Sequence, residues 1–333
     1  MGQLPDYDDL PTTAGLPSSW GLWGPVGTDM FGCLNLQTPE RIVAAAGLVQ
    51  RGAVFPLNWS AGLPDPPLFN RVGHRHEVTG NDASVSHDDV LHGWNTQSSS
   101  QWDGFRHIRN MAAQAAGLGT GHYGGAPDES HGMHHWARRG IVGRAVLADV
   151  GRWRERIGRP LRCDQADPIE PQELLDCLAD QGTEVREGDV LLLRTGWVAW
   201  YEGTDPETRA VLADRSRLST PGLRSGVELS RTLWNLHIAA IAADNPAVEA
   251  LPFGADRSAD ERVALRADPD HMHEVFSHTS LLPMLGLPLG EMWDLEALAA
   301  DCAADGRYEC FFTSAPLNLP SGVASPPNAI AIK

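Results

Sequence analysis

The sequence predicts a single α/β domain that spans residues 39–333 and follows an irregular N-terminal arm over residues 1–38. Short apolar segments typical of buried strands alternate along the chain with amphipathic segments typical of helices. Neither an internal repeat nor a linker of low complexity interrupts this alternation. A chain of 333 residues is also long enough to bury a sizeable core. These observations favour one mixed α/β domain.

Local patterns place the individual elements. Apolar, β-favouring runs predict strands at residues 53–59, within 188–197, and at 141–150, 237–243 and 308–315. Helices are predicted at residues 39–49, 171–179, 225–236 and 294–304. Thr38 as N-cap and Pro39 at the first helical position mark the start of the first helix. Asp294 caps the last helix, and Gly306 ends it.

Three other segments are expected to be irregular. Residues 1–38 are rich in proline, glycine and tryptophan without periodicity, which indicates an arm on the surface. The loop at residues 61–67 contains three prolines and is expected to lie over a cleft. Residues 117–125 are too rich in glycine for a helix or strand. Residues 72–94 are polar and carry no predicted element.

Composition excludes several classes of partner. The chain has 26 Lys plus Arg against 43 Asp plus Glu, which gives a net charge of −17. Such a surface repels phosphate backbones and anionic lipids, so neither nucleic acid nor membrane is expected as a partner. The first ten residues lack the pattern of a secretory signal, and no apolar run approaches the roughly 18 residues of a membrane span. Five dispersed cysteines also argue against a disulfide framework. We therefore expect a cytoplasmic protein that acts on a small molecule.

The most concentrated candidate chemistry lies at residues 97–107. Asp103 and His107 are four residues apart and follow a run of serines. If this segment is extended, the side chains of Gln97, Gln101 and Asp103 share one face because strand side chains alternate. Such a row of polar groups could hold a metal ion or bind a substrate.

Four sequence blocks occur in an order that resembles one family. Residues 188–197 read GDVLLLRTGW, and residues 242–249 read AADNPAVE. Residues 278–298 follow the pattern H-x-x-L-L…E…D-L-E-x-L, and residues 315–331 follow A-P-L…S-P-x-N-x-I-A. The chain thus resembles the metal-dependent cyclase family, which includes bacterial kynurenine formamidase and isatin hydrolase. The resemblance implies that family's swivelling β/β/α fold and assembly as a homodimer or homotetramer.

The hallmark of that family, H-x-x-x-H-x-D-x-x-x-H, is only half present. Asp103 and His107 match its Asp, which binds metal, and its last His, which performs acid–base chemistry. Gln97 and Gln101 stand where the family has its two leading His ligands. The resemblance therefore implies a divergent branch whose metal site is altered.

Further ligands are implied near the C-terminus, where His278 and Glu291 resemble the family's distant His and Glu. The implied metal ligands are Asp103, Gln101, Gln97, His278 and Glu291, and the implied catalytic residues are His107 and Asp103. An amide oxygen is a poor Zn²⁺ ligand, so this oxygen-rich set favours Mn²⁺ over Zn²⁺. Equally open is a site without metal, in which the Gln amides fix Asp103 or bind the substrate.

Other histidines compete for a metal role by type. His271 and His273 lie close to His278 in the sequence, and His74 and His76 repeat their spacing. Histidine pairs in polar loops are usually solvated rather than ligating.

The leading functional hypothesis is a metal-assisted hydrolase of an amide, formamide, lactam or lactone, with His107 as general acid and base. One alternative is a cyclase or dehydratase that works by acid–base chemistry without metal. Another is a relative that binds a small molecule without turning it over. Five tryptophans in the first 102 residues suggest that one or two line a pocket for an aromatic or cyclic substrate.

Overall fold

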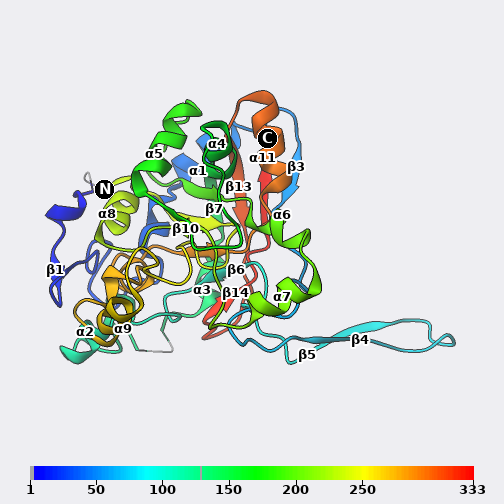
Figure 1. Ribbon diagram of the computed structural model, residues 1–333, viewed down its shortest axis with the longest axis horizontal. Coiled ribbons are helices and arrows are strands. Elements are labelled where there is room, and N and C mark those ends of the chain that lie inside the picture. The colour runs from blue at the N-terminus through cyan, green and yellow to red at the C-terminus, as the bar shows by residue number, and fades with distance from the viewer. Residues whose placement is uncertain (1–3, 128–129) are drawn as a thin grey trace.

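The computed structural model describes residues 4–127 and 130–333, and it has the mixed α/β single-domain fold that the sequence predicts (Figure 1). In this described part of the chain, nine strands form one sheet. In spatial order they are β14 (Ala324–Ser325), β6 (Gln101–Asp103), β12 (Leu289–Glu291), β11 (Ala240–Ala243), β9 (Val190–Arg194), β7 (Ile141–Asp149), β13 (Glu309–Ser314), β15 (Ala329–Ile332) and β3 (Val54–Pro56).

The centre of the sheet is parallel and its flanks are antiparallel. Strands β7, β9, β11 and β12 run parallel to one another. Their side chains are buried on both faces, which explains why β9 and β11 read as continuous apolar runs rather than alternating ones. Strand β6 pairs antiparallel with β12, and this register sets Gln101 opposite Glu291.

The predicted helices are present with small shifts of their ends. They are α1 (Pro39–Ala46), α5 (Pro171–Asp180), α8 (Val227–Asn235) and α11 (Glu296–Asp305). The Thr38 hydroxyl accepts a hydrogen bond from the Arg41 amide, as an N-cap should. Gly306 ends α11 with a φ of 72°, a conformation that glycine adopts without strain. Helix α5 buries Leu174 and Leu178 against the core.

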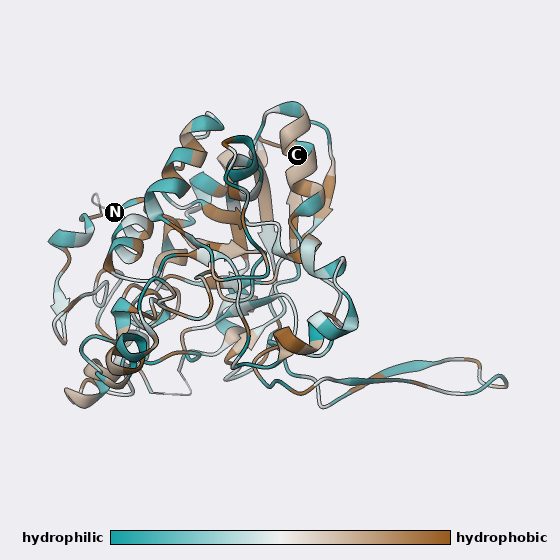
Figure 2. Ribbon diagram, viewed as in Figure 1, coloured by the Kyte–Doolittle hydropathy of each residue, from teal (hydrophilic) through white to brown (hydrophobic). Residues whose placement is uncertain are grey.

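Hydrophobic residues concentrate in the central strands and the helix faces that cover them, as Figure 2 shows. A second apolar cluster lies beside this core and contains Trp59, Trp197, Tyr201 and Met292. The ring centroids of Trp59 and Tyr201 are 5.3 Å apart in an edge-to-face arrangement. Three members of this cluster, Leu218, Ala247 and Leu251, also line the cavity described below. Within the described residues, no helix combines the length and apolarity that crossing a membrane would require.

The N-terminal segment is irregular, as expected, but it is more deeply embedded than a surface arm. Leu34 and Leu36 are buried in the main core, and the indole of Trp20 donates a 2.6 Å hydrogen bond to the Pro283 carbonyl. Residues 1–3 of the predicted arm lie outside the described residues.

The polar segment at residues 72–94 forms an element that the sequence did not predict. Strands β4 (Arg75–Thr79) and β5 (Asp88–His92) pair as a hairpin that projects from the body of the molecule. None of the side chains in these two strands is buried. Because the hairpin contributes nothing to the core, hydrophobic patterning could not reveal it.

Short elements complete the described chain. The helices are α2 (Met111–Ala115), α3 (Met133–Arg139), α4 (Val150–Arg156), α6 (Trp197–Glu202), α7 (Pro206–Ala213), α9 (Ala259–Ala267) and α10 (His278–Leu281). The short strands are β1 (Thr12–Thr13), β2 (Leu16–Pro17), β8 (Pro168–Ile169) and β10 (Gly222–Leu223).

Candidate active site

A cavity of about 370 Å³ collects most of the residues that the sequence singled out. Gln97, His107, His278 and Glu291 all line it, although they are up to 194 residues apart in the chain. Asp103 is fully buried behind them. The structure therefore brings together, at one place, every site residue that the family resemblance implied.

Gln101 and Asp103 enter the site from β6, and their shared face agrees with the expected alternation. The Gln101 amide donates hydrogen bonds to Asp103 Oδ1 at 3.1 Å and to Glu291 Oε2 at 2.5 Å, so it bridges two carboxylates. Gln97 precedes the strand in a turn rather than in an extended segment. Its amide nevertheless donates to Asp103 Oδ1 at 2.8 Å. In this arrangement both glutamines turn N–H groups towards the carboxylates.

His278 begins α10 and is held between two glutamates. Its Nδ1 lies 2.5 Å from Glu249 Oε1, and its Nε2 lies 3.2 Å from Glu291 Oε1. Glu249 also accepts hydrogen bonds from the backbone amides of Ser277 and His278, which fix the carboxylate. Burial alone would lower the pKa of His278, but the hydrogen bonds to Glu249 and Glu291 outweigh it and raise the pKa to about 10. A metal ion would have to compete with the proton on Nε2.

Two observations bear on whether these residues fit a divalent cation. Asp103, His278 and Glu291 each offer one ligand atom, and these atoms lie within 4.8 Å of one another. Asp103 Oδ2 is buried and makes no hydrogen bond within the described residues. Burial and the nearby Asp103 charge raise the pKa of Glu291 to about 7. The carboxylates of Asp103 and Glu291 therefore repel each other, and a cation between them would relieve this repulsion. The donor set of two carboxylates and one imidazole fits a divalent cation.

His107 lies at the wall of the cavity between Gln97 and Asp103. Its Nδ1 is 3.2 Å from the Gln97 amide nitrogen, and its Nε2 is 3.5 Å from Asp103 Oδ2. Since Gln97 donates to Nδ1 in this arrangement, the ring carries its proton on Nε2, towards Asp103. Burial lowers the pKa of His107, so the imidazole is neutral near pH 7 and able to accept a proton.

Arg71 is a site residue that sequence reasoning missed. Its guanidinium donates to the Gln101 side-chain oxygen at 3.1 Å and also to the Gln97 carbonyl. Gln101 is thereby oriented, because its oxygen faces Arg71 while its N–H groups face the carboxylates. Arg71 belongs to no motif, and only the fold brings it to β6. Glu249 was visible in the AADNPAVE block, but its pairing with His278 was not predicted.

Among the described residues no tryptophan lines this cavity, although Trp59 and Trp94 line a smaller pocket. Within the described residues, the aromatic rings that line this cavity are those of Phe69, Phe253 and Phe276. Trp102 is fully buried, where its indole donates a 2.9 Å hydrogen bond to Ser314. Large aromatic side chains pack first into the core, so their number in a sequence says little about a pocket.

The competing histidines form no metal site with the residues that the structure describes. His76 pairs with Asp89 in the exposed hairpin, and His271 pairs with Asp268 on the surface. In the described ranges, the one group of His, Cys, Asp and Glu side chains with metal-binding spacing is Asp103, His278 and Glu291.

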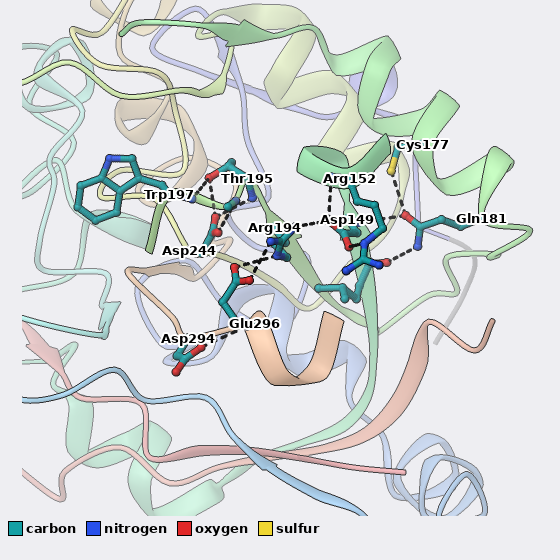
Figure 3. A network of polar contacts seen from close by, with 12 residues as sticks. Asp149, Arg152, Cys177, Gln181, Arg194, Thr195, Trp197, Asp244, Asp294 and Glu296 are labelled. Carbon is teal, nitrogen blue, oxygen red and sulfur yellow. Dashed lines mark hydrogen bonds and ion pairs between the residues drawn. The ribbon is translucent and has the colours of Figure 1, made fainter. Parts of the chain in front are cut away.

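A separate polar network at the ends of neighbouring strands contains the end of the GDVLLLRTGW block, from Arg194 to Trp197, and Asp244 of the AADNPAVE block (Figure 3). Arg194 donates to both oxygens of Glu296, each at 2.8 Å, and to Asp149 Oδ1 at 2.7 Å. Asp244 accepts 2.7 Å hydrogen bonds from the Thr195 amide, the Thr195 hydroxyl and the Gly196 amide. These contacts fasten β9 to its neighbours, and none of the residues lines the cavity.

Comparisons with known proteins agree with this architecture. The model of the family described as "Putative cyclase" matches residues 55–250. A crystal structure titled as a novel cyclase has 30% sequence identity, covers 95% of this chain and 99% of its own, and gives a TM-score of 0.76.

More distant structures share the fold. Isatin hydrolase A from Labrenzia aggregata, bound to benzyl benzoate, has 16% identity and a TM-score of 0.54 over 88% of this chain and 97% of its own. An isatin hydrolase bound to the product analogue thioisatinate has 14% identity and a TM-score of 0.55 over 89% and 98%. No curated protein sequence matches the chain. The family match, which spans more than half of the chain, and the 30% identity over nearly all of it show that the chain belongs to the cyclase family.

Proposed function

We propose that this protein is a hydrolase that cleaves an amide, formamide, lactam or lactone bond in a small aromatic or cyclic molecule. The observation that carries the proposal is the pairing of His107 with Asp103 at the wall of the cavity. Asp103 Oδ2 has no hydrogen-bond donor within the described residues and lies 3.5 Å from His107 Nε2. A neutral imidazole next to a buried carboxylate suits proton transfer near pH 7. The hydrolase name of the isatin hydrolases, which share the fold, supports the same reaction class.

Each residue has a role that follows from its contacts. His107 Nδ1 accepts from Gln97 in this arrangement, so it has to exchange that hydrogen bond for the attacking water; it then takes a proton from the water and returns it to the leaving nitrogen or oxygen. Asp103 stabilises the imidazolium that forms, and Gln97 holds both side chains in place through its amide. Glu249 fixes the orientation of His278 at the other side of the cavity.

Asp103, His278 and Glu291 would hold the divalent cation, which would supply a water molecule of lowered pKa. Two carboxylates and one imidazole are ligands that Mn²⁺ accepts, whereas softer metal ions prefer thiolates, so this ligand set favours Mn²⁺. Whether the amide oxygen of Gln97 or Gln101 also ligates the ion stays a prediction. Gln101 would have to release Arg71 in order to do so.

A second candidate is acid–base catalysis of cyclisation or dehydration without metal. The specific observation in its favour is that Gln97 and Gln101 already donate N–H groups to Asp103 Oδ1. Amide hydrogens would then replace part of the positive charge that a metal ion brings.

Activity and metal content measured on one preparation test both candidates. Formanilide and isatin are suitable substrates, assayed before chelation, after chelation and after addition of Mn²⁺ or Zn²⁺. We expect bound metal, loss of hydrolysis on chelation and recovery with Mn²⁺. His107→Ala should lower kcat by about 10²- to 10⁴-fold. His92→Ala, in the exposed hairpin, is the matched control and should leave kcat unchanged.

The outcomes separate the candidates. Full activity after exhaustive chelation would select the mechanism without metal. Absence of bound metal together with full activity of His107→Ala would reject the proposed hydrolase mechanism.

A further inference from the structure

The cavity has two chemically different ends. Its floor is buried and acidic, with Glu291 beside Asp103. Its outer walls carry guanidinium groups and phenyl rings. Within the described residues, these are Arg215, Arg266, Phe69, Phe253 and Phe276, while Arg71 also lines the cavity but reaches towards its floor, where it donates to Gln101. The chain has 43 acidic and 26 basic residues, so its surface is acidic on average. Three arginines around one cavity are a local exception to this acidity.

Two of these arginines lack a carboxylate partner. Neither Arg215 nor Arg266 forms an ion pair with any residue that the structure describes, and both are exposed at the outer end of the cavity. Nearby surface arginines behave differently: Arg224 pairs with Glu170 at 2.6 Å, and Arg257 pairs with Glu274 at 3.2 Å. The cavity arginines therefore keep their charge and their N–H donors available to a ligand.

The two free guanidinium groups also act on each other. Although much of the Arg266 side chain is exposed, its guanidinium packs on two phenyl rings; this partial burial, followed by the like charge of Arg215, lowers the pKa of Arg266. Arg266 is kept in place by the rings of Phe253 and Phe276, whose centroids lie 5.5 Å and 5.7 Å from its guanidinium carbon. A bound anion would relieve this repulsion and use both forks of N–H donors.

The apolar part of the wall indicates the shape of the ligand. Phe253 and Phe276 have ring centroids 4.3 Å apart, and the Phe276 ring stacks on His278 at 5.1 Å. Phe69 covers the guanidinium of Arg71 at 4.9 Å. Flat rings that reach from the arginines to the imidazole suit a planar ligand that extends from the outer end to the floor.

We propose that the substrate is a planar aromatic molecule with a carboxylate group, which Arg215 and Arg266 bind while the scissile bond lies beside His107. This inference rests on the proposed function and adds the charge of the substrate to it. Arg71 contributes less to binding the carboxylate, because its guanidinium already donates hydrogen bonds to the Gln97 carbonyl and the Gln101 side-chain oxygen.

Matched substrates test the inference. Formanilide and its ring-carboxylate derivatives differ only in the anionic group, so the ratio of their kcat/KM values measures selection for charge. We expect the wild type to prefer one of the carboxylates. Arg215→Gln and Arg266→Gln should each reduce that ratio at least about 10-fold, as expected for the loss of a charged hydrogen bond. Arg262→Gln is the matched control, because Arg262 lies on the same helix α9 but does not line the cavity.

Binding provides a readout that does not depend on turnover. Calorimetry with benzoate should show binding to the wild type and to Arg262→Gln, and a loss of at least about 10-fold in affinity in the double variant Arg215→Gln/Arg266→Gln. If formanilide is hydrolysed as well as its carboxylates and the double variant keeps the same ratio, the inference fails while the proposed function stands. If no compound is hydrolysed, benzoate decides: equal binding by the wild type and the double variant, or no binding by either, overturns the inference.

Discussion

Two buried polar clusters in this sheet both contain Asp and Glu carboxylates but differ in the groups that donate hydrogen bonds to them. In the cluster around Arg194, a guanidinium stands between Glu296 and Asp149 and donates to both. Asp244, at the end of the neighbouring strand, accepts three hydrogen bonds of its own. Hydrogen bonds to Glu296 and the Asp149 charge outweigh the cost of burial and raise the pKa of Arg194.

Among the residues that the structure describes, the cluster around Asp103 has no guanidinium bound directly to a carboxylate: its cations are the His278 imidazolium and Arg71, which donates to Gln101. Glu249 and Glu291 share the single imidazole of His278, and Asp103 receives only amide hydrogens. One oxygen of Asp103 has no hydrogen bond within the described residues. We therefore propose that the first cluster stabilises the fold, whereas the second, in which a buried Asp103 oxygen has no donor among the described residues, serves a metal ion, a proton or a substrate.

The largest expected effect is on stability. Arg194→Met should lower the free energy of unfolding by about 3–5 kcal/mol, because Asp149 and Glu296 would lose their shared cation and stay partly buried. Denaturant unfolding measures this loss. Arg224→Met, which removes an exposed pair with Glu170, is the control and should cost less than about 1 kcal/mol. Equal losses in both variants would show that the Arg194 cluster does not carry the fold.

A smaller effect of a different kind is expected at Asp103. Asp103→Asn removes charge from an acid-rich cluster, so unfolding should change by less than about 1 kcal/mol or shift towards greater stability. The same variant should lose at least about 100-fold in kcat, because the imidazolium of His107 would lack its partner. A destabilisation as large as that of Arg194→Met, with activity retained, would reverse the roles assigned to the two clusters.

The smallest expected effect is a pH dependence in the structural cluster. Burial raises the pKa of Asp244 to about 6, against about 4 in an unfolded chain. Between these values the folded protein keeps a proton that the unfolded chain releases. The stabilisation from Asp244 is therefore complete below about pH 4 and declines as the pH rises to about 6.

Unfolding of the wild type and of Asp244→Asn at several pH values measures this term, because asparagine does not titrate. The stability of the wild type relative to the variant should fall by about 2 kcal/mol between pH 4 and pH 7, as expected for a pKa difference of about two units. A relative stability that rises with pH would mean that the hydrogen bonds from Thr195 and Gly196 lower this pKa instead.

The buried strands and helices were the elements that the sequence predicted. Strands β7, β9 and β11 were predictable because continuous apolar runs of this length have one physical explanation, burial in the sheet. Helix α9 was not predicted: it buries none of its residues, and its capping box of Ser258 and Glu261 was the sequence signal that could have revealed it. The hairpin of β4 and β5 was not predicted either, because none of the side chains in these strands is buried.

The site was predictable only as far as the family resemblance extended. Asp103, His107, His278 and Glu291 came from matched motifs, and the fold brings them together. Arg71, Arg215 and Arg266 lie in segments without motifs, and only tertiary structure brings them to one cavity. The most recognisable block, GDVLLLRTGW, proved to belong to the Arg194 network rather than to the cavity.

The base of the projecting hairpin has a consequence for how this chain can change during evolution. The hydrogen bond from Arg71 to the Gln97 carbonyl joins two residues that are 26 positions apart, one before the hairpin and one after it. Everything between them forms a loop whose two ends are fixed by site residues, while its tip at Val85 is exposed and packs on no core. Exposed tips of this kind tolerate insertions and deletions. The hairpin can therefore lengthen, shorten or acquire a new recognition sequence while Arg71 and Gln97 at its base keep their positions.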